Sequence, residues 1–191
     1  MRKLLLPVLV FLIACNSKKD DKKPEKNENT DYLVTMDGIG PLTTEMTQQE
    51  IEKVLNKKIP LNNPNDTTSG SWEDTATVEY KEAELKLSFV RTYGATDSFY
   101  MRVTGMKTSS PLCKTNSGLG VGSSKQQIID TYDDHVLLID PDFEDTTYTR
   151  RSRSRYTINV RVDWEGPEIR FFLKDNKVYA IEVTSFHDDA E

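Results

Sequence analysis

Alternating apolar and polar residues form the clearest pattern in the second half of the chain. Apolar side chains occupy every second position in segments 158–164, 169–173 and 179–183. Turn-forming residues separate these segments at 165–167 and 175–176. Because successive side chains of a β-strand point to opposite sides, this pattern predicts three consecutive antiparallel strands with one side in a core.

The first half of the chain carries the same pattern less strongly. Segments 76–80, 85–89 and 99–103 place apolar side chains two positions apart. They predict a second set of three antiparallel strands. The sequences "FYMRVT" at 99–104 and "VYAIEVT" at 178–184 end alike, which indicates an internal repeat with a period near 80 residues.

A short helix is predicted ahead of each set of strands. The sequences "TQQE" at 47–50 and "SKQQ" at 124–127 are capping boxes, in which the first and last side chains bond each other's backbone N–H groups. Apolar residues follow at helical spacing in 51–55 and 128–132.

Together these elements predict an α+β fold made of two tandem repeats, at about 36–106 and 112–186. Each repeat has one helix followed by three antiparallel strands, and the repeats together form a sheet with helices on one face. A Gly-apolar-Gly triplet precedes each capped helix, followed by "EMTQQEI" in the first repeat and "VGSSKQQI" in the second. This signature resembles the β-lactamase-inhibitor-protein-like architecture. A related single unit occurs in the small lipoprotein of the outer-membrane barrel-assembly machine. The resemblance implies binding of other proteins through the open sheet face, without catalysis.

The N-terminus has the features of an export signal. Arg2 and Lys3 precede an apolar run over 4–14, which is too short to span a bilayer. Leu12-Ile13-Ala14-Cys15 resembles the lipobox of bacterial lipoproteins, in which the peptide is cut before the cysteine. The resemblance implies that residues 1–14 are a signal peptide and that Cys15 carries diacylglycerol on sulfur and an acyl chain such as palmitate on nitrogen. The alternative is an ordinary secreted protein with a chance cysteine.

Residues 15–31 are predicted to be a disordered tether, because after Cys15 they offer no apolar side chain that could join a core. A flexible chain of this length spans roughly 20 Å, which holds residues 32–191, a single globular domain, close to the membrane. Residues 17–21 are similar to an acidic export signal of surface-exposed lipoproteins, or are simply a solvated linker. We therefore expect a lipid-anchored protein of the bacterial cell envelope, in the outer membrane or at the cell surface.

Charge and cysteine content narrow the choice of partners. Without residues 1–14 the chain has 23 basic and 31 acidic residues, a formal net charge of −8. This balance argues against a nucleic-acid partner.

The cysteine content excludes an intrachain disulfide. If Cys15 carries the lipid, Cys113 is the only other cysteine, so it has no cysteine to pair with and is expected to be a buried free thiol.

The sequence offers little metal or cofactor chemistry. The acidic segment 140–145 has carboxylate side chains at alternate positions, as a calcium-binding loop does. Such a loop needs Gly at its sixth position and Glu at its twelfth, where this chain has Asp145 and Arg151. We interpret it as a solvated acidic loop, although calcium binding there remains open. The glycines of 118–122 lack the context of a nucleotide-binding loop, and the two histidines do not cluster. No cofactor is expected.

An arginine-rich stretch at 150–164 is the main candidate for a binding surface. If the strand at 158–164 extends backward, alternate side chains of this stretch share the solvent side. Outward positions on other strands add further arginines and aromatic residues, which protein-binding hot spots favour. The predicted partner-binding residues are Arg151, Arg153, Arg155, Arg161, Arg170, Phe172, Tyr100 and Arg102. The alternatives are an edge strand protected from aggregation by charge, or a stripe neutralised by the 140–145 loop.

The sequence therefore predicts a non-enzymatic lipoprotein that binds a protein partner, which an arginine-rich surface suggests is acidic. One alternative is an inhibitor or immunity lipoprotein that blocks an enzyme. A second is an envelope glycan hydrolase that uses carboxylates such as Glu73, Asp74 or Glu165, which would have to meet in a concave pocket.

Overall fold

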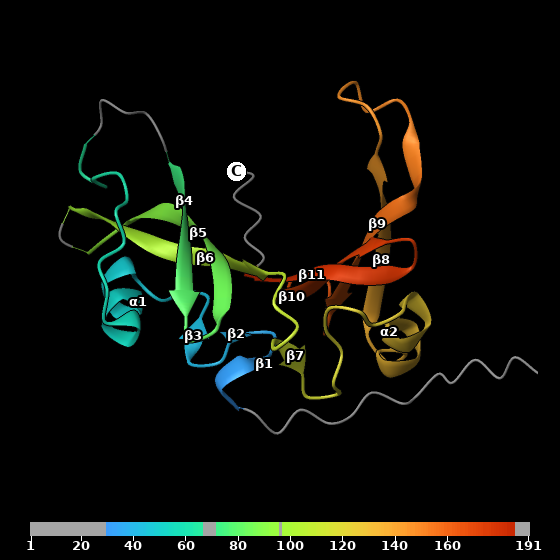
Figure 1. Ribbon diagram of the computed structural model, residues 1–191. Coiled ribbons are helices and arrows are strands. Elements are labelled where there is room, and N and C mark those ends of the chain that lie inside the picture. The colour runs from blue at the N-terminus through green and yellow to red at the C-terminus, as the bar shows by residue number, and fades with distance from the viewer. Residues whose placement is uncertain (1–29, 67–71, 96, 186–191) are drawn as a thin grey trace, which may run out of the picture.

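The computed structural model describes residues 30–66, 72–95 and 97–185, and most of them belong to two β-sheets (Figure 1). The larger sheet has seven antiparallel strands. In spatial order they are β4 (Glu73–Tyr80), β5 (Ala83–Tyr93), β6 (Phe99–Thr108), β11 (Lys177–Thr184), β10 (Glu168–Lys174), β9 (Arg151–Arg161) and β8 (Val136–Phe143).

A small sheet of two-residue strands lies beside the middle of the larger one (Figure 1). Its order is β3 (Leu42–Thr43), β2 (Gly38–Ile39), β1 (Leu33–Val34) and β7 (Lys114–Thr115), and a 3₁₀ turn, η1 (Thr30–Tyr32), precedes β1. Glycine is required at position 38, since a Cβ there would lie 2.0 Å from the carbonyl oxygen of Leu42. The glycine triplet therefore builds this tight hairpin.

Two short helices complete the fold, α1 (Gln48–Leu55) and α2 (Lys125–Thr131). The predicted capping boxes are confirmed. The Thr47 side chain accepts a hydrogen bond from the backbone N–H of Glu50, and the backbone N–H of Thr47 donates to the Glu50 carboxylate. Ser124 and Gln127 make the same two bonds, with the Gln127 side-chain oxygen as the second acceptor. Among the described residues, no helix is long and apolar enough to cross a membrane.

One hydrophobic core joins all these elements. The large sheet contributes alternate side chains such as Phe89 and Phe171, and the small sheet contributes Ile39 and Leu42. Strand β6 pairs with β11 at the centre of the sheet, although the two are far apart in sequence. The core therefore depends on both halves of the chain, as expected for one domain.

The predicted α+β fold class is wrong. The described residues form eleven strands in two sheets and only two helices, so the protein is mostly β. The two helices bury only Ile51, Glu52 and Ile128, which is too little apolar surface to cover a seven-stranded sheet. The small sheet supplies much of the missing cover, so the tandem repeat of one helix and three strands with helices on one face is not the architecture.

Two further strand predictions are corrected by the structure. After α2 the chain forms four strands rather than three, because 136–143 forms β8 where a loop and part of the acidic segment 140–145 were expected. Strand β9 ends at Arg161, so Val162 and Trp164 leave the sheet and are each 66% exposed rather than continuing its apolar side. The lipobox and nearly all of the predicted tether lie outside the described residues.

Candidate partner-binding surface

The seven-stranded sheet buries one side in the core, and we call the opposite side its outer face. In β9, Ile158 and Val160 are fully buried, whereas the alternate side chains point to the outer face. Arg151, Arg153 and Arg155 are exposed there, as the predicted strand phase requires. The backward extension of this strand is therefore confirmed.

Charged side chains cross the middle of the outer face in register. Strand pairing places directly opposite one another, in order, Lys86 of β5, Lys107 of β6, Glu182 of β11, Arg170 of β10 and Asn159 of β9. Side chains opposed in this way interact directly. Glu182 stands between two cations, which offsets the repulsion between the two lysines.

A cation lies on an aromatic ring beside this row. The Nζ atom of Lys107 is 3.3 Å from the ring centroid of Phe172, whose ring centroid is 6.3 Å from that of Tyr179. Burial lowers the pKa of Lys107, and the Glu182 carboxylate opposes this shift. Such cation–aromatic contacts contribute about 0.5–2 kcal/mol. The Lys107–Phe172–Tyr179 patch thus presents apolar rings and a partly desolvated charge, a combination that suits a protein interface.

The seven-stranded sheet is curled rather than flat. Figure 1 shows the β4–β5 and β8–β9 ends rising on either side of the central strands.

A buried carboxylate lies near one end of the outer face. Glu168 is fully buried, and its two carboxylate oxygens accept hydrogen bonds from the Nε atoms of Arg161 and Arg170. Arg161 also donates to the carbonyl of Trp164 at 3.1 Å, and Arg170 lies 3.8 Å from Glu182. Both predicted arginines therefore lie on the expected face, but their charges are engaged within the protein.

The β8–β9 hairpin holds part of the arginine stripe in place. Arg155 donates to the carbonyl of Phe143 at 3.0 Å, and Arg150 pairs with Glu144 at 2.8 Å. Within the described part of the chain, Arg151 and Arg153 have no ion-pair partner. The acidic segment therefore pairs with Arg150 and fixes the Arg155 side chain through a backbone carbonyl, and the charges of Arg151 and Arg153 stay available to a partner.

Tyr100 and Arg102 lie away from the other predicted residues, near the start of β6. Arg102 pairs with Glu45, and its side chain is only 12% exposed. Tyr100 lines a separate hollow of about 280 Å³ together with Thr47 and Gln48. The eight predicted residues thus form two groups. Within the group on β9 and β10, Phe172 belongs to the Lys107–Phe172–Tyr179 patch, and Arg170 lies in the same cross-strand row as Lys107.

Sequence reasoning missed two members of that patch because β-bulges change the strand phase. The pairing of β5 with β6 shifts between Ser88 and Phe89, which brings Lys107 to the outer face. The pairing of β10 with β11 shifts between Phe172 and Leu173. Tyr179 is therefore 44% exposed rather than part of the core. Gly105, beside the first bulge, is the only local signal for it, because glycine within a strand often marks a bulge.

The carboxylates considered for glycan hydrolysis do not converge. Glu73 and Asp74 are neighbours on the edge strand β4, so they point to opposite sides. Asp74 accepts hydrogen bonds from the backbone N–H groups of Asn62 and Thr75. Glu165 is exposed in the turn after β9, near the opposite edge of the sheet. This arrangement provides no acid–base pair among the three.

Metal and thiol chemistry find little support in the described parts of the chain. No three His, Cys, Asp or Glu side chains gather there closely enough to hold a metal ion. Asp145 instead accepts hydrogen bonds from Thr149 and from the backbone of Arg150, and its pKa is lowered mainly by the Thr149 hydroxyl. Cys113 is free and buried, as expected, and burial raises the pKa of its thiol.

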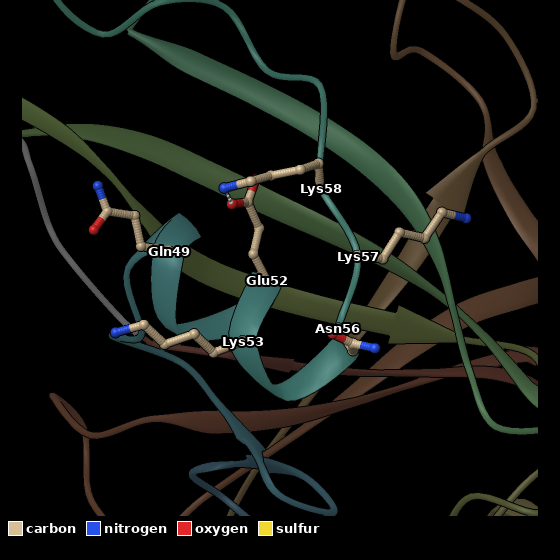
Figure 2. A pocket seen from close by; sticks show the side chains of 6 residues that line it. All are labelled: Gln49, Glu52, Lys53, Asn56, Lys57 and Lys58. Atoms are coloured by element: carbon tan, nitrogen blue, oxygen red, sulfur yellow. Dashed lines mark hydrogen bonds and ion pairs between the residues drawn. The ribbon is translucent and has the colours of Figure 1, made fainter.

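A surface hollow of about 490 Å³ lies beside α1 (Figure 2). The side chains that line it mainly hold the chain together locally. Glu52 pairs with Lys58 at 2.6 Å and accepts a hydrogen bond from the backbone N–H of Ile59 at 2.9 Å. These contacts, that with Lys58 foremost, lower the pKa of Glu52. They tie the segment after the helix back onto it. The remaining lining includes Lys53 and Lys57.

No protein-family model, curated protein or solved structure matches this chain.

Proposed function

We propose that this protein is a lipid-anchored lipoprotein of the bacterial envelope or cell surface that binds a protein partner on the outer face of its seven-stranded sheet. The lipobox-like sequence ending in Cys15 supports the anchor. The observation that carries the binding proposal is the Lys107–Phe172–Tyr179 patch on the outer face. The same face carries Arg151 and Arg153, which have no ion-pair partner among the described residues.

This surface combines the two properties that protein recognition needs. Rings and arginines supply contact area and energy, since binding energy concentrates in aromatic and arginine side chains. Unpaired surface cations steer an oppositely charged partner during encounter. The partner is therefore proposed to present acidic groups around an apolar centre.

Replacing Cys15 with serine is expected to abolish acyl labelling and to move the protein from the membrane fraction to the soluble fraction, because the lipid chains are the proposed anchor. The matched control is Cys113→Ser, which removes the other cysteine and should leave fractionation unchanged. Labelled-palmitate incorporation and membrane fractionation measure both effects. Unchanged fractionation of the Cys15 variant would refute the anchor.

Reversing Arg153 and Arg155 to glutamate is expected to slow association with the partner at least severalfold and to weaken its salt dependence, because exposed charges act mainly on the encounter rate. The partner is first identified by cross-linking in intact envelopes, and association is then measured at several salt concentrations.

The control for this experiment reverses Lys53 of α1 and Lys57, which follows the helix, and should leave association unchanged. Circular dichroism checks that both variants stay folded. If Arg153→Glu/Arg155→Glu binds with unaltered rate and salt dependence, the stripe is only a protected sheet edge.

A further inference from the structure

A row of three cations crosses one end of the outer face. Strand pairing places Lys174 of β10 directly opposite Arg155 of β9 on one side and Lys177 of β11 on the other. All three side chains are exposed, and Lys174 lies two positions after Phe172 on the same strand, so the row belongs to the outer face. Opposed side chains on neighbouring strands lie roughly 5 Å apart, which spreads the three charges over about 10 Å. We call Arg155, Lys174 and Lys177 the basic row.

The backbone holds two of these like charges opposite each other. Asp175 and Asn176 form a two-residue turn between Lys174 and Lys177, and both have positive φ, as a tight β-hairpin requires. The turn therefore fixes the register in which the two lysines meet. Like charges placed directly opposite on neighbouring strands destabilise a sheet.

The basic row lacks a counter-charge among the described residues. No carboxylate there forms an ion pair with Lys174 or Lys177. Arg155 donates to the backbone carbonyl of Phe143, which is neutral. The other charged row of the outer face differs, because there Glu182 stands between two cations. The basic row therefore keeps a repulsion that an anionic ligand would relieve.

Two aromatic rings adjoin the basic row. Phe172 and Tyr179 each lie two positions from a lysine of the row, and their ring centroids are 6.3 Å apart. Lys107, whose Nζ atom lies 3.3 Å from the Phe172 centroid, adds a fourth cation beside the rings. A short peptide offers carboxylates and apolar side chains together, whereas a linear anionic glycan carries its charges without apolar side chains. The neighbouring rings therefore favour a peptide as the ligand.

We propose that the basic row binds an extended acidic segment of the protein partner, with carboxylates on the row and an apolar side chain against Phe172 and Tyr179. This inference rests on the proposed function and names the part of the partner that the outer face recognises. Alternate side chains of an extended peptide point the same way roughly 6.7 Å apart, so two carboxylates fit within the row. Hydrogen bonds between charged groups are the stronger ones. The chain has 31 acidic and 25 basic residues, so it attracts an acidic peptide only where cations cluster.

Fluorescence anisotropy with labelled peptides tests the inference on the purified full chain. The probe is a peptide with three glutamates on each side of one phenylalanine. One matched peptide has glutamine in place of glutamate, and another has glycine in place of phenylalanine. At about 20 mM salt the probe is expected to bind at least about tenfold more tightly than the glutamine peptide and about threefold more tightly than the glycine peptide. Raising the salt to about 200 mM should weaken probe binding severalfold, because exposed charges are screened.

Two double substitutions locate the binding. Lys174→Gln/Lys177→Gln removes two charges of the row and should weaken probe binding at least about fivefold. Lys53→Gln/Lys57→Gln removes two exposed lysines on and after α1 and should change nothing. Thermal unfolding verifies that both variants are folded. The unfolding midpoint of Lys174→Gln/Lys177→Gln should equal or exceed that of the wild type, because the substitution removes like-charge repulsion.

Four results would overturn the inference. Three of them are no binding of the probe up to about 1 mM, equal affinity for the probe and the glutamine peptide, and unchanged probe binding by Lys174→Gln/Lys177→Gln. The fourth is tighter binding of a heparin octasaccharide than of the probe, which would assign the row to an anionic glycan. If the probe fails but Arg153→Glu/Arg155→Glu slows association with a cross-linked partner, only this inference falls and the proposed function stands.

Discussion

Replacing Glu168 with alanine is expected to lower the free energy of unfolding by about 3–5 kcal/mol, because it breaks a buried ion pair from one side. The carboxylate is fully buried and accepts hydrogen bonds from both Arg161 and Arg170. The Arg161 side chain is only 11% exposed, so its charge would remain buried without a counter-charge. Urea unfolding of the wild type and the variant at neutral pH measures the difference.

Two matched substitutions separate the ion pair from a general effect of removing an acidic residue. Glu165→Ala removes an exposed carboxylate three positions earlier and should change stability by less than about 0.5 kcal/mol. Glu168→Gln keeps an acceptor oxygen and removes the charge, so its effect should fall between the other two. A loss below about 1 kcal/mol for Glu168→Ala would mean that water replaces the carboxylate around both arginines.

The features predicted correctly from the sequence are local ones. Each capping box is a set of hydrogen bonds between residues three positions apart, so Thr47 and Ser124 could be assigned without any tertiary information. The alternating segments were also placed on the right strands, because one buried side imposes a period of two on the sequence.

The fold class could not be predicted because its decisive elements leave almost no pattern. Strands of two residues, such as β1 and β7, are too short to show alternation. Strand β8 reads "VLLIDPDF", an apolar run followed by a proline between two acids, which resembles a loop. Proline is tolerated there because β8 is an edge strand. These elements decide whether the fold is α+β or mostly β.

The candidate surface was predicted in part, for reasons that lie in sheet geometry. The phase of Arg151, Arg153 and Arg155 follows from simple alternation in β9. Two further features follow from long-range pairing. Cross-strand register places Glu168 opposite Arg161, and a bulge brings Lys107 to the outer face. Register and bulges join segments distant in sequence, so a single sequence carries little trace of them.

The neighbouring residues Phe171 and Phe172 of β10 give a test of which face is the core. Phe171→Ala is expected to lower the free energy of unfolding by about 3–5 kcal/mol, since it removes a large buried ring and leaves a cavity. Phe171 is fully buried, opposite Ile158 on β9 and Ile181 on β11. Tyr132, just after α2, packs nearby, with 6.2 Å between the two ring centroids. Urea unfolding again provides the measurement.

Phe172→Ala is the control, because it makes the same chemical change one residue along the strand. Phe172 points to the outer face, where it contacts Lys107 and Tyr179. Its removal should cost about 0.5–2 kcal/mol, mainly the lost cation–aromatic contact, because no core cavity forms. Equal losses for the two variants would mean that the outer face is packed as tightly as the core, and a free binding surface there would be ruled out. A large loss for Phe171→Ala beside a small one for Phe172→Ala leaves the Phe172 ring available to a partner.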